Sequence, residues 1–420
     1  MFNELNKLRK NNLNNFYAII IISCFPLFFL FSSLLTNLFT IILIFLFLSE
    51  IKFKPKNIMK DKILLLLILF WFFILISLFT SIYFENSILR SVGFLRFIFF
   101  SYALAYYIKL DNFKYFKIIL LIWFSIFLIT SIDLFIEYVF GHNLLGNKSY
   151  MTGRLSGFLG DELKIGNYYL GFYFLTLVFL IQFFKNQFLN FTIIIFITLI
   201  AFLIGERANF VKIILGLLIF SIFYEKIIIK YKIIFFGLII SCVFILINFN
   251  SDFKTRYKTQ IYNPLKTEGI YNYIKGIPYG AHFSTAYEIF KENPINGIGL
   301  KNFYFECGKD KYIDKEFVFN HARCSTHPHQ LHLEILSHIG IFGYLVFIYL
   351  FFYLIYFGFI NYLKNKNPYL LVSLIFIFVS IFTPVPSGSF FTTYGATIFW
   401  LNFGLVLAFS SKQSKLKYIQ

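Results

Sequence analysis

Long apolar runs, separated by short polar segments, occupy most of this 420-residue chain. A helix needs about 20 mainly apolar residues, within a range of about 17 to 25, to cross the hydrocarbon core of a bilayer. Polar hinges near Ser32 and at Gly205-Glu206-Arg207 separate the two most closely spaced pairs of runs. The pattern predicts about twelve transmembrane helices, at residues 16–32, 34–49, 63–82, 92–108, 118–140, 165–184, 188–204, 208–223, 231–249, 331–359, 369–384 and 390–410.

The same pattern divides the chain into three parts. Residues 1–249 hold predicted helices 1–9, residues 250–330 form one large loop, and residues 331–420 hold predicted helices 10–12. The predicted fold class is therefore an all-α polytopic membrane protein.

Composition supports this class. Hydrophobic residues make up 59% of the chain and charged residues 14%, whereas a soluble protein is about one quarter charged. Soluble enzymes, secreted disulfide scaffolds and disordered regulators are excluded.

The net charge of +18 follows the predicted topology. If the N-terminus is cytoplasmic, the inner segments hold 20 basic residues and the short outer connections hold six. This asymmetry is typical of multi-pass proteins and, with an even helix count, places both termini in the cytoplasm. Because the basic residues are scattered between apolar runs, we expect membrane lipids as partners and no nucleic acid. A bacterial inner membrane fits this orientation.

Residues 250–330 contain eleven basic residues, eight acidic residues and four of the seven His. Long loops are translocated largely regardless of charge, so we expect this loop in the periplasm, with one amphipathic helix from about Ser284 to Asn293. Cys307 and Cys324 both lie in it, and an oxidising compartment would allow a disulfide worth roughly 3 kcal/mol. A metal site built from these Cys and nearby His is the alternative. No CxxC or HExxH spacing supports a metal, and no cofactor is expected.

The densest polar run, from Cys324 to His332, directly precedes an apolar run. Ser325 and Thr326 are typical N-cap residues and Pro328 suits the first helical position, which would place His329 in the first turn of predicted helix 10. The helix dipole there disfavours imidazolium, and a neutral imidazole is suited to act as a general base. The alternative is that these His residues only bridge lipid headgroups and water.

Arg154 and Arg207 lie at the same predicted outer face, together with Asp161, Glu162 and the large loop. An Arg at membrane depth is costly and suggests a function. One guanidinium group can bind two phosphate oxygens at once. Two Arg on one face would suit a pyrophosphate, whereas the alternatives are a tight external turn at Arg207 and an ordinary solvated Arg154. Asp133 and Glu137, spaced i, i+4, are expected to pair with an Arg such as Arg90 in a structural role.

Several loose motifs occur in a specific order: Arg154 to Phe158, then Gly-Glu-Arg-Ala at 205–208, Ala286 to Gly299, and His-Pro-His-Gln-x-x-Leu-Glu at 327–334. In this order and spacing the chain resembles the O-antigen ligase family, which shares a membrane superfamily with O-antigen polymerases and protein O-oligosaccharyltransferases. The resemblance covers roughly residues 60–410. It implies a fold like that of the GT-C membrane glycosyltransferases.

The resemblance also implies a reaction in lipopolysaccharide biosynthesis. A glycan on undecaprenyl diphosphate would be moved, without a metal, to a sugar hydroxyl of lipid A–core at the periplasmic face. His329 would be the catalytic base, with His327 as the alternative, and Arg154 and Arg207 would hold the pyrophosphate. His332, Gln330, Arg323 and Arg256 are further candidates for substrate binding. Gln330 stands where the family usually has Asn, and His332 where it usually has an aromatic residue.

Other functions remain open at this point. An O-antigen polymerase would use a second lipid-linked glycan as acceptor, and a protein glycosylase would use a Ser or Thr hydroxyl. A lipid-linked glycan flippase or transporter would instead have ionisable or broken-helix residues near the bilayer midplane and pseudo-repeated halves. The collection of polar residues at one face favours the enzyme.

Overall fold

The computed structural model describes residues 2–51, 61–160 and 162–410. Asp161 and part of the predicted inner charge, namely Lys52, Lys54, Lys56, Lys60, Lys412, Lys415 and Lys417, lie outside these residues. Every regular element within the described ranges is helical, as predicted.

Each of the twelve predicted segments contains a helix. The helices are α2 (Leu13–Phe31), α3 (Ser33–Glu50), α5 (Lys62–Ile76), α6 (Phe84–Gly93) continuing into α7 (Leu95–Ile108), α8 (Phe116–Phe140), α9 (Ile165–Phe183), α10 (Gln187–Leu203), α11 (Arg207–Phe223), α12 (Ile229–Phe249), α17 (Leu331–Asn365), α18 (Pro368–Phe382) and α19 (Thr393–Phe409), with α1 (Phe2–Asn11) before them.

Within the described residues, seven helices are long and apolar enough to cross a membrane: α2, α3, α6–α7, α8, α9, α12 and α17. Four further apolar helices are shorter, namely α5, α10, α18 and α19. The chain is a multi-pass membrane protein, and the total of twelve spans stays a prediction.

The polar hinges end helices where the sequence placed them. Ser32 ends α2 and begins α3, where its side chain accepts a hydrogen bond from the Leu34 N–H at 3.0 Å. Gly205 separates α10 from α11 with a φ of +76°, and a Cβ there would collide with the Gly153 carbonyl oxygen. Because a left-handed residue with no room for a side chain must be Gly, the turn can pack directly against residues 153–155.

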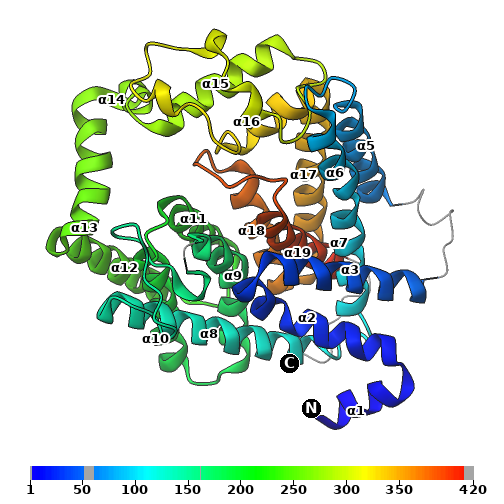
Figure 1. Ribbon diagram of the computed structural model, residues 1–420. Helices are drawn as coiled ribbons and strands as arrows, with labels where there is room; N and C mark the ends of the chain where they lie inside the picture. The colour runs from blue at the N-terminus through cyan, green and yellow to red at the C-terminus, as the bar shows by residue number, and fades with distance from the viewer. Residues whose placement is uncertain (1, 52–60, 161, 411–420) are drawn as a thin grey trace.

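Residues 250–330 are more helical than the sequence suggested. They form α13 (Ser251–Phe253), a π-helix (Lys254–Tyr262), α14 (Asn263–Lys275), α15 (Pro278–Glu292) and α16 (Phe303–Glu306), which arch from α12 to α17 at the end of the molecule opposite α1 (Figure 1). The helix predicted from Ser284 begins six residues earlier, because Pro278 occupies the first helical position.

The arch is fixed to α17 at a kink. Gly340 has a φ of +71°, and a Cβ there would collide with the Ile295 carbonyl oxygen. The turn after α15 packs into this kink, where the Ile341 N–H donates to the Pro294 carbonyl at 2.8 Å. A second backbone hydrogen bond holds the same turn to α17, since the Gly299 N–H donates to the His338 carbonyl at 3.0 Å. The arch is therefore registered on the helix that follows the His-rich run.

Candidate functional site

Three His side chains meet where the arch joins α17. The ring centroids of His327 and His329 are 4.1 Å apart, and those of His282 and His329 are 5.3 Å apart. Tyr279 lies edge-on to His329 at 5.4 Å. His282 and Tyr279 come from α15 and were not singled out in the sequence, because only the fold brings that helix to the His-rich run.

The expected place of His329 in a helix is wrong. Helix α17 begins at Leu331, and Gln330 is its N-cap, accepting a hydrogen bond from the Leu333 N–H at 2.7 Å. His329 lies before the helix with a φ of +57°. The expected cap residues bind imidazoles instead, since the Ser325 hydroxyl lies 2.9 Å from Nε2 of His329 and the Thr326 hydroxyl 3.0 Å from Nδ1 of His327.

A left-handed backbone is rare for a residue other than Gly and costs free energy unless its surroundings enforce it. Here the segment before α19 enforces it. The Ser387 N–H donates to the His329 carbonyl at 2.8 Å, and Nε2 of His327 donates to the Ser387 carbonyl at 3.3 Å. The buried Glu334 carboxylate holds this segment in turn, by accepting hydrogen bonds from the Ser389 hydroxyl and, at 2.9 Å, from the Phe390 N–H. Sequence reasoning gave Glu334 no role.

The hydrogen bonds define the state of the rings. A carbonyl can only accept, so His327 carries its proton on Nε2 and accepts from Thr326 on Nδ1, which leaves neither nitrogen free. His282 likewise donates from Nδ1 to the Arg323 carbonyl at 2.9 Å. Burial lowers the pKa of His327 to about 4. Burial, and then the neighbouring His327 and His282, lower the pKa of His329 to about 3, so both rings are neutral.

Three Arg side chains converge from three separate segments. Arg207 donates from Nη1 to the Arg256 carbonyl at 2.9 Å, and Arg256 donates from Nη2 to the Gly205 carbonyl at 2.7 Å. Arg154 reaches Glu206 at 2.9 Å, which is the single ion pair of these three Arg within the described part of the chain. Burial, and then Arg207 and Arg154, lower the pKa of Arg256. The cluster of Arg154, Arg207 and Arg256 thus carries excess positive charge.

Two carboxylates, those of Glu206 and Glu137, position Arg154 within this cluster. Burial raises the pKa of Glu206, and Arg154 opposes that rise. Glu137 accepts hydrogen bonds from the Ser156 N–H at 2.9 Å and the Gly157 N–H at 2.7 Å, which fixes the loop that carries Arg154. The expected structural role of Glu137 fits, but the expected Arg90 partner is wrong.

Tyr279 connects the two clusters. Its ring contacts His329, and its phenol is close enough to Arg256 to affect the pKa of that guanidinium. The His group and the Arg cluster therefore both adjoin the 250–330 arch, with Tyr279 in contact with His329.

The other predicted site residues do not join this centre. Arg323 donates to the Cys307 and Gly308 carbonyls, both at 3.0 Å, next to the disulfide between Cys307 and Cys324, whose Cα atoms are 5.3 Å apart. Nδ1 of His332 lies 3.2 Å from the Tyr344 hydroxyl. Gln330 uses its side-chain oxygen for the helix cap.

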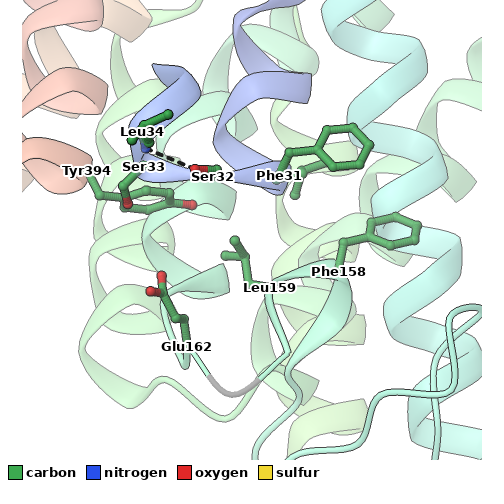
Figure 2. Close-up of a pocket in the computed structure, with 9 residues that line it drawn as sticks. Phe31, Ser32, Ser33, Leu34, Phe158, Leu159, Glu162 and Tyr394 are labelled. Atoms are coloured by element: carbon green, nitrogen blue, oxygen red, sulfur yellow. Dashed lines mark hydrogen bonds between the residues drawn. The ribbon is translucent and has the colours of Figure 1, made fainter. Parts of the chain in front are cut away.

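A cavity of about 250 Å³ borders the Arg154 loop (Figure 2). Phe158, Leu159 and Glu162 line it from that loop, opposite Ser32–Leu34 and Tyr394. Figure 2 shows the Glu162 carboxylate and the Tyr394 ring turned toward the same space. The lining combines aromatic and aliphatic side chains with hydroxyls and one carboxylate, and such a mixed lining is suited to a ligand that has both apolar and hydroxyl-bearing parts.

No group of three or more His, Cys, Asp or Glu in the described parts of the chain is arranged to hold a metal.

Residues 191–348 match the family model described as O-antigen ligase. The predicted resemblance to this family is confirmed over that region. Comparison with curated proteins gives no match. The matched region contains Arg207, Arg256, His282, His327 and His329, so it covers the His group and two of the three Arg of the cluster, and the matched family implies a glycosyltransferase-like activity.

Proposed function

We propose that this protein transfers a glycan from undecaprenyl diphosphate to a sugar hydroxyl of lipid A–core, at the periplasmic face of the bacterial inner membrane. The observation that carries the proposal is the pairing of two clusters, one with excess positive charge and one with a neutral His. A transfer from a lipid diphosphate needs both, since a diphosphate must be held as it leaves and a hydroxyl must lose its proton.

The Arg cluster is the proposed pyrophosphate site. Arg207 and Arg256 form no ion pair with a described carboxylate, and their half-buried position strengthens their attraction to phosphate oxygens. They would bind the donor and stabilise the charge that develops on the leaving diphosphate. The neighbouring cavity would accept part of the glycan.

His329 is the proposed base. His329 is the ring that contacts both Tyr279 and His282 of α15, and the Ser325 hydroxyl lies 2.9 Å from its Nε2. His329 would take the proton of the acceptor hydroxyl as that oxygen attacks the anomeric carbon. The bond from this carbon to the diphosphate oxygen breaks in the same step, and the diphosphate leaves with its electron pair. The bound donor carries negative charge, which would raise the pKa of His329 and help it hold the proton.

A test in a strain lacking its own ligase separates the roles. Wild type, His329→Ala and Arg207→Ala would be expressed at matched membrane abundance, with Lys148→Ala as a control that removes an exposed charge. Wild type and the control should restore glycan on lipid A–core when the lipopolysaccharide is resolved on a gel. Loss of one base reduces rates by about 10²–10⁴, so His329→Ala should leave lipid A–core bare. Bare lipid A–core with long lipid-linked chains in wild type would instead indicate a polymerase.

A further inference from the structure

A second group of basic side chains lies beside the segment that holds the His residues. Arg90 on α6 donates from Nη1 to the Phe391 carbonyl and to the Thr393 hydroxyl, both at 3.3 Å. Arg96 on α7 donates from Nη2 to the same Thr393 hydroxyl, also at 3.3 Å. Two guanidinium groups therefore share one hydroxyl at the start of α19.

Lys301 adds to this group from the arch. The Leu300 carbonyl before it accepts a hydrogen bond from the Ser87 hydroxyl of α6 at 2.6 Å, which brings the backbone at Lys301 to α6. Burial, and then the charge of Arg90, lower the pKa of Lys301. The two side chains are therefore close enough to repel each other.

Among the described residues, no carboxylate forms an ion pair with this basic group. Each guanidinium has five N–H groups, and its described protein partners use few of them. Nε of Arg96 is buried and has no acceptor among these residues. Unpaired cations in an apolar helix bundle are costly, so the arrangement fits an anion that the protein binds.

The start of α19 adds to the attraction. Thr392, its N-cap, makes no side-chain cap hydrogen bond, so the N–H groups of the first turn are left for a ligand. A helix N-terminus with free N–H groups favours phosphate. Arg90 and Arg96 thus supply charge where the helix supplies directed donors.

The position distinguishes this group from the Arg154–Arg207–Arg256 cluster. α6 and α11 lie on opposite sides of α18 and α19 (Figure 1). The segment that binds Arg90 through Phe391 also binds His329 through Ser387. The segment at residues 387–393 therefore links His329 to the group of Arg90 and Arg96. On its other side, His329 contacts Tyr279, which affects the pKa of Arg256 in the Arg cluster.

We infer that Arg90, Arg96, Lys301 and the start of α19 form a second anion site, which binds a phosphate group on a membrane-anchored acceptor. The inference rests on the proposed function, which assigns the Arg154–Arg207–Arg256 cluster to the donor. It favours a phosphate-bearing lipid as the acceptor over an unphosphorylated protein, because a Ser or Thr hydroxyl on a protein brings no anion to this place.

Binding can be tested without transfer. Full-length protein in phosphatidylcholine nanodiscs would be titrated with a fluorescent single-chain alkyl phosphate and with the matching alcohol. The double variant R90Q/R96Q should bind the phosphate at least about tenfold more weakly, because it loses two charged hydrogen-bond donors, and should bind the alcohol unchanged. K148Q is the matched control and should bind both probes like wild type. Unchanged phosphate binding by R90Q/R96Q would overturn the inference.

Kinetics with the natural substrates then identify which lipid is bound. R90Q/R96Q should raise the KM for the acceptor and leave the KM for the donor unchanged, whereas R256Q should do the reverse. A loss of probe binding with an unchanged acceptor KM would mean that the site holds a bilayer phospholipid, and would overturn the acceptor assignment. If wild type transfers no glycan at all, the proposed function fails. The probe titration still decides whether Arg90 and Arg96 hold a lipid phosphate.

Discussion

His329 combines a left-handed backbone, a hydroxyl partner and a strongly lowered pKa of about 3. An imidazole that stays neutral at low pH is always ready to accept a proton, but holds it weakly in the free protein. A bound diphosphate would correct this, because negative charge favours imidazolium. His329 would therefore hold a proton firmly enough to act as a base only when the donor diphosphate is bound.

The pH dependence of transfer should show this. The pH profile of kcat/KM reports groups of the free enzyme, and that of kcat reports groups of the substrate complex. Since a lowered pKa extends the neutral form to lower pH, kcat/KM should not decline through the usual His range near pH 6.5. The acidic limb of kcat should lie at higher pH than that of kcat/KM. Coincident limbs near pH 6.5, unchanged in the Glu206→Gln control, would contradict the assignment.

Sequence reasoning at the residue scale found some groups and missed others for physical reasons. Arg154 and Arg207 interrupt Gly-rich or apolar segments, where the cost of a charged residue indicates a role, and His329 lies in the densest polar run of the chain, directly before an apolar run. Tyr279 and His282 lie on an ordinary amphipathic helix, so no local pattern marks them. The predicted start of helix 10 was wrong for a specific reason: Gln330 is the N-cap of α17, whereas Ser325 and Thr326 were expected to cap it.

Among the elements, the tight turn between α10 and α11 matters most for the Arg cluster. It brings Glu206 and Arg207 to Arg154, and it depends on Gly205, whose φ is +76° and whose missing side chain leaves room for the Gly153 carbonyl. A strained backbone position costs about 1–3 kcal/mol.

Gly205→Ala should therefore lower the free energy of unfolding by about 1–3 kcal/mol, and should reduce donor binding by displacing the Arg cluster. Gly237→Ala is the matched control, because Gly237 lies within α12 with open space around its Cβ position. Thermal unfolding in detergent should show a lower Tm for Gly205→Ala and an equal or higher Tm for the control. Equal Tm values and equal donor KM values in both variants would show that the turn is unimportant.

The disulfide belongs to the same scale, because it fixes the arch beside the His group. Cys307 and Cys324 close a loop of 17 residues, and cross-links of this kind stabilise by about 2–4 kcal/mol. Cys307→Ser with Cys324→Ser should lower the Tm and weaken the Arg323 carbonyl contact that orients His282. Cys24→Ser with Cys242→Ser removes the two free Cys and should change neither the Tm nor transfer. Equal Tm values for the two double variants would contradict a structural disulfide.

For the whole molecule, apolar run length predicted the helices well, since a bilayer imposes this length on any spanning segment. It predicted less about the 250–330 region, because a segment without long apolar runs follows no such length constraint, and one helix was expected where several form. The junction of this arch with the Gly340 kink could not be predicted, since contacts between distant segments depend on shapes that only folding creates.

At the scale of the whole molecule, the proposed function requires that the His group beside the arch activates the acceptor while the Arg cluster beside the α10–α11 turn holds the donor, in one transfer reaction. Purified protein with labelled glycan on undecaprenyl diphosphate and with lipid A–core would test it most directly, by following glycan transfer and diphosphate release together. Wild type should produce both products in equal amounts. His329→Ala should still bind the donor but transfer about 10²–10⁴ more slowly, and Arg256→Gln should lose donor affinity. Transfer by His329→Ala at the wild-type rate would contradict the account.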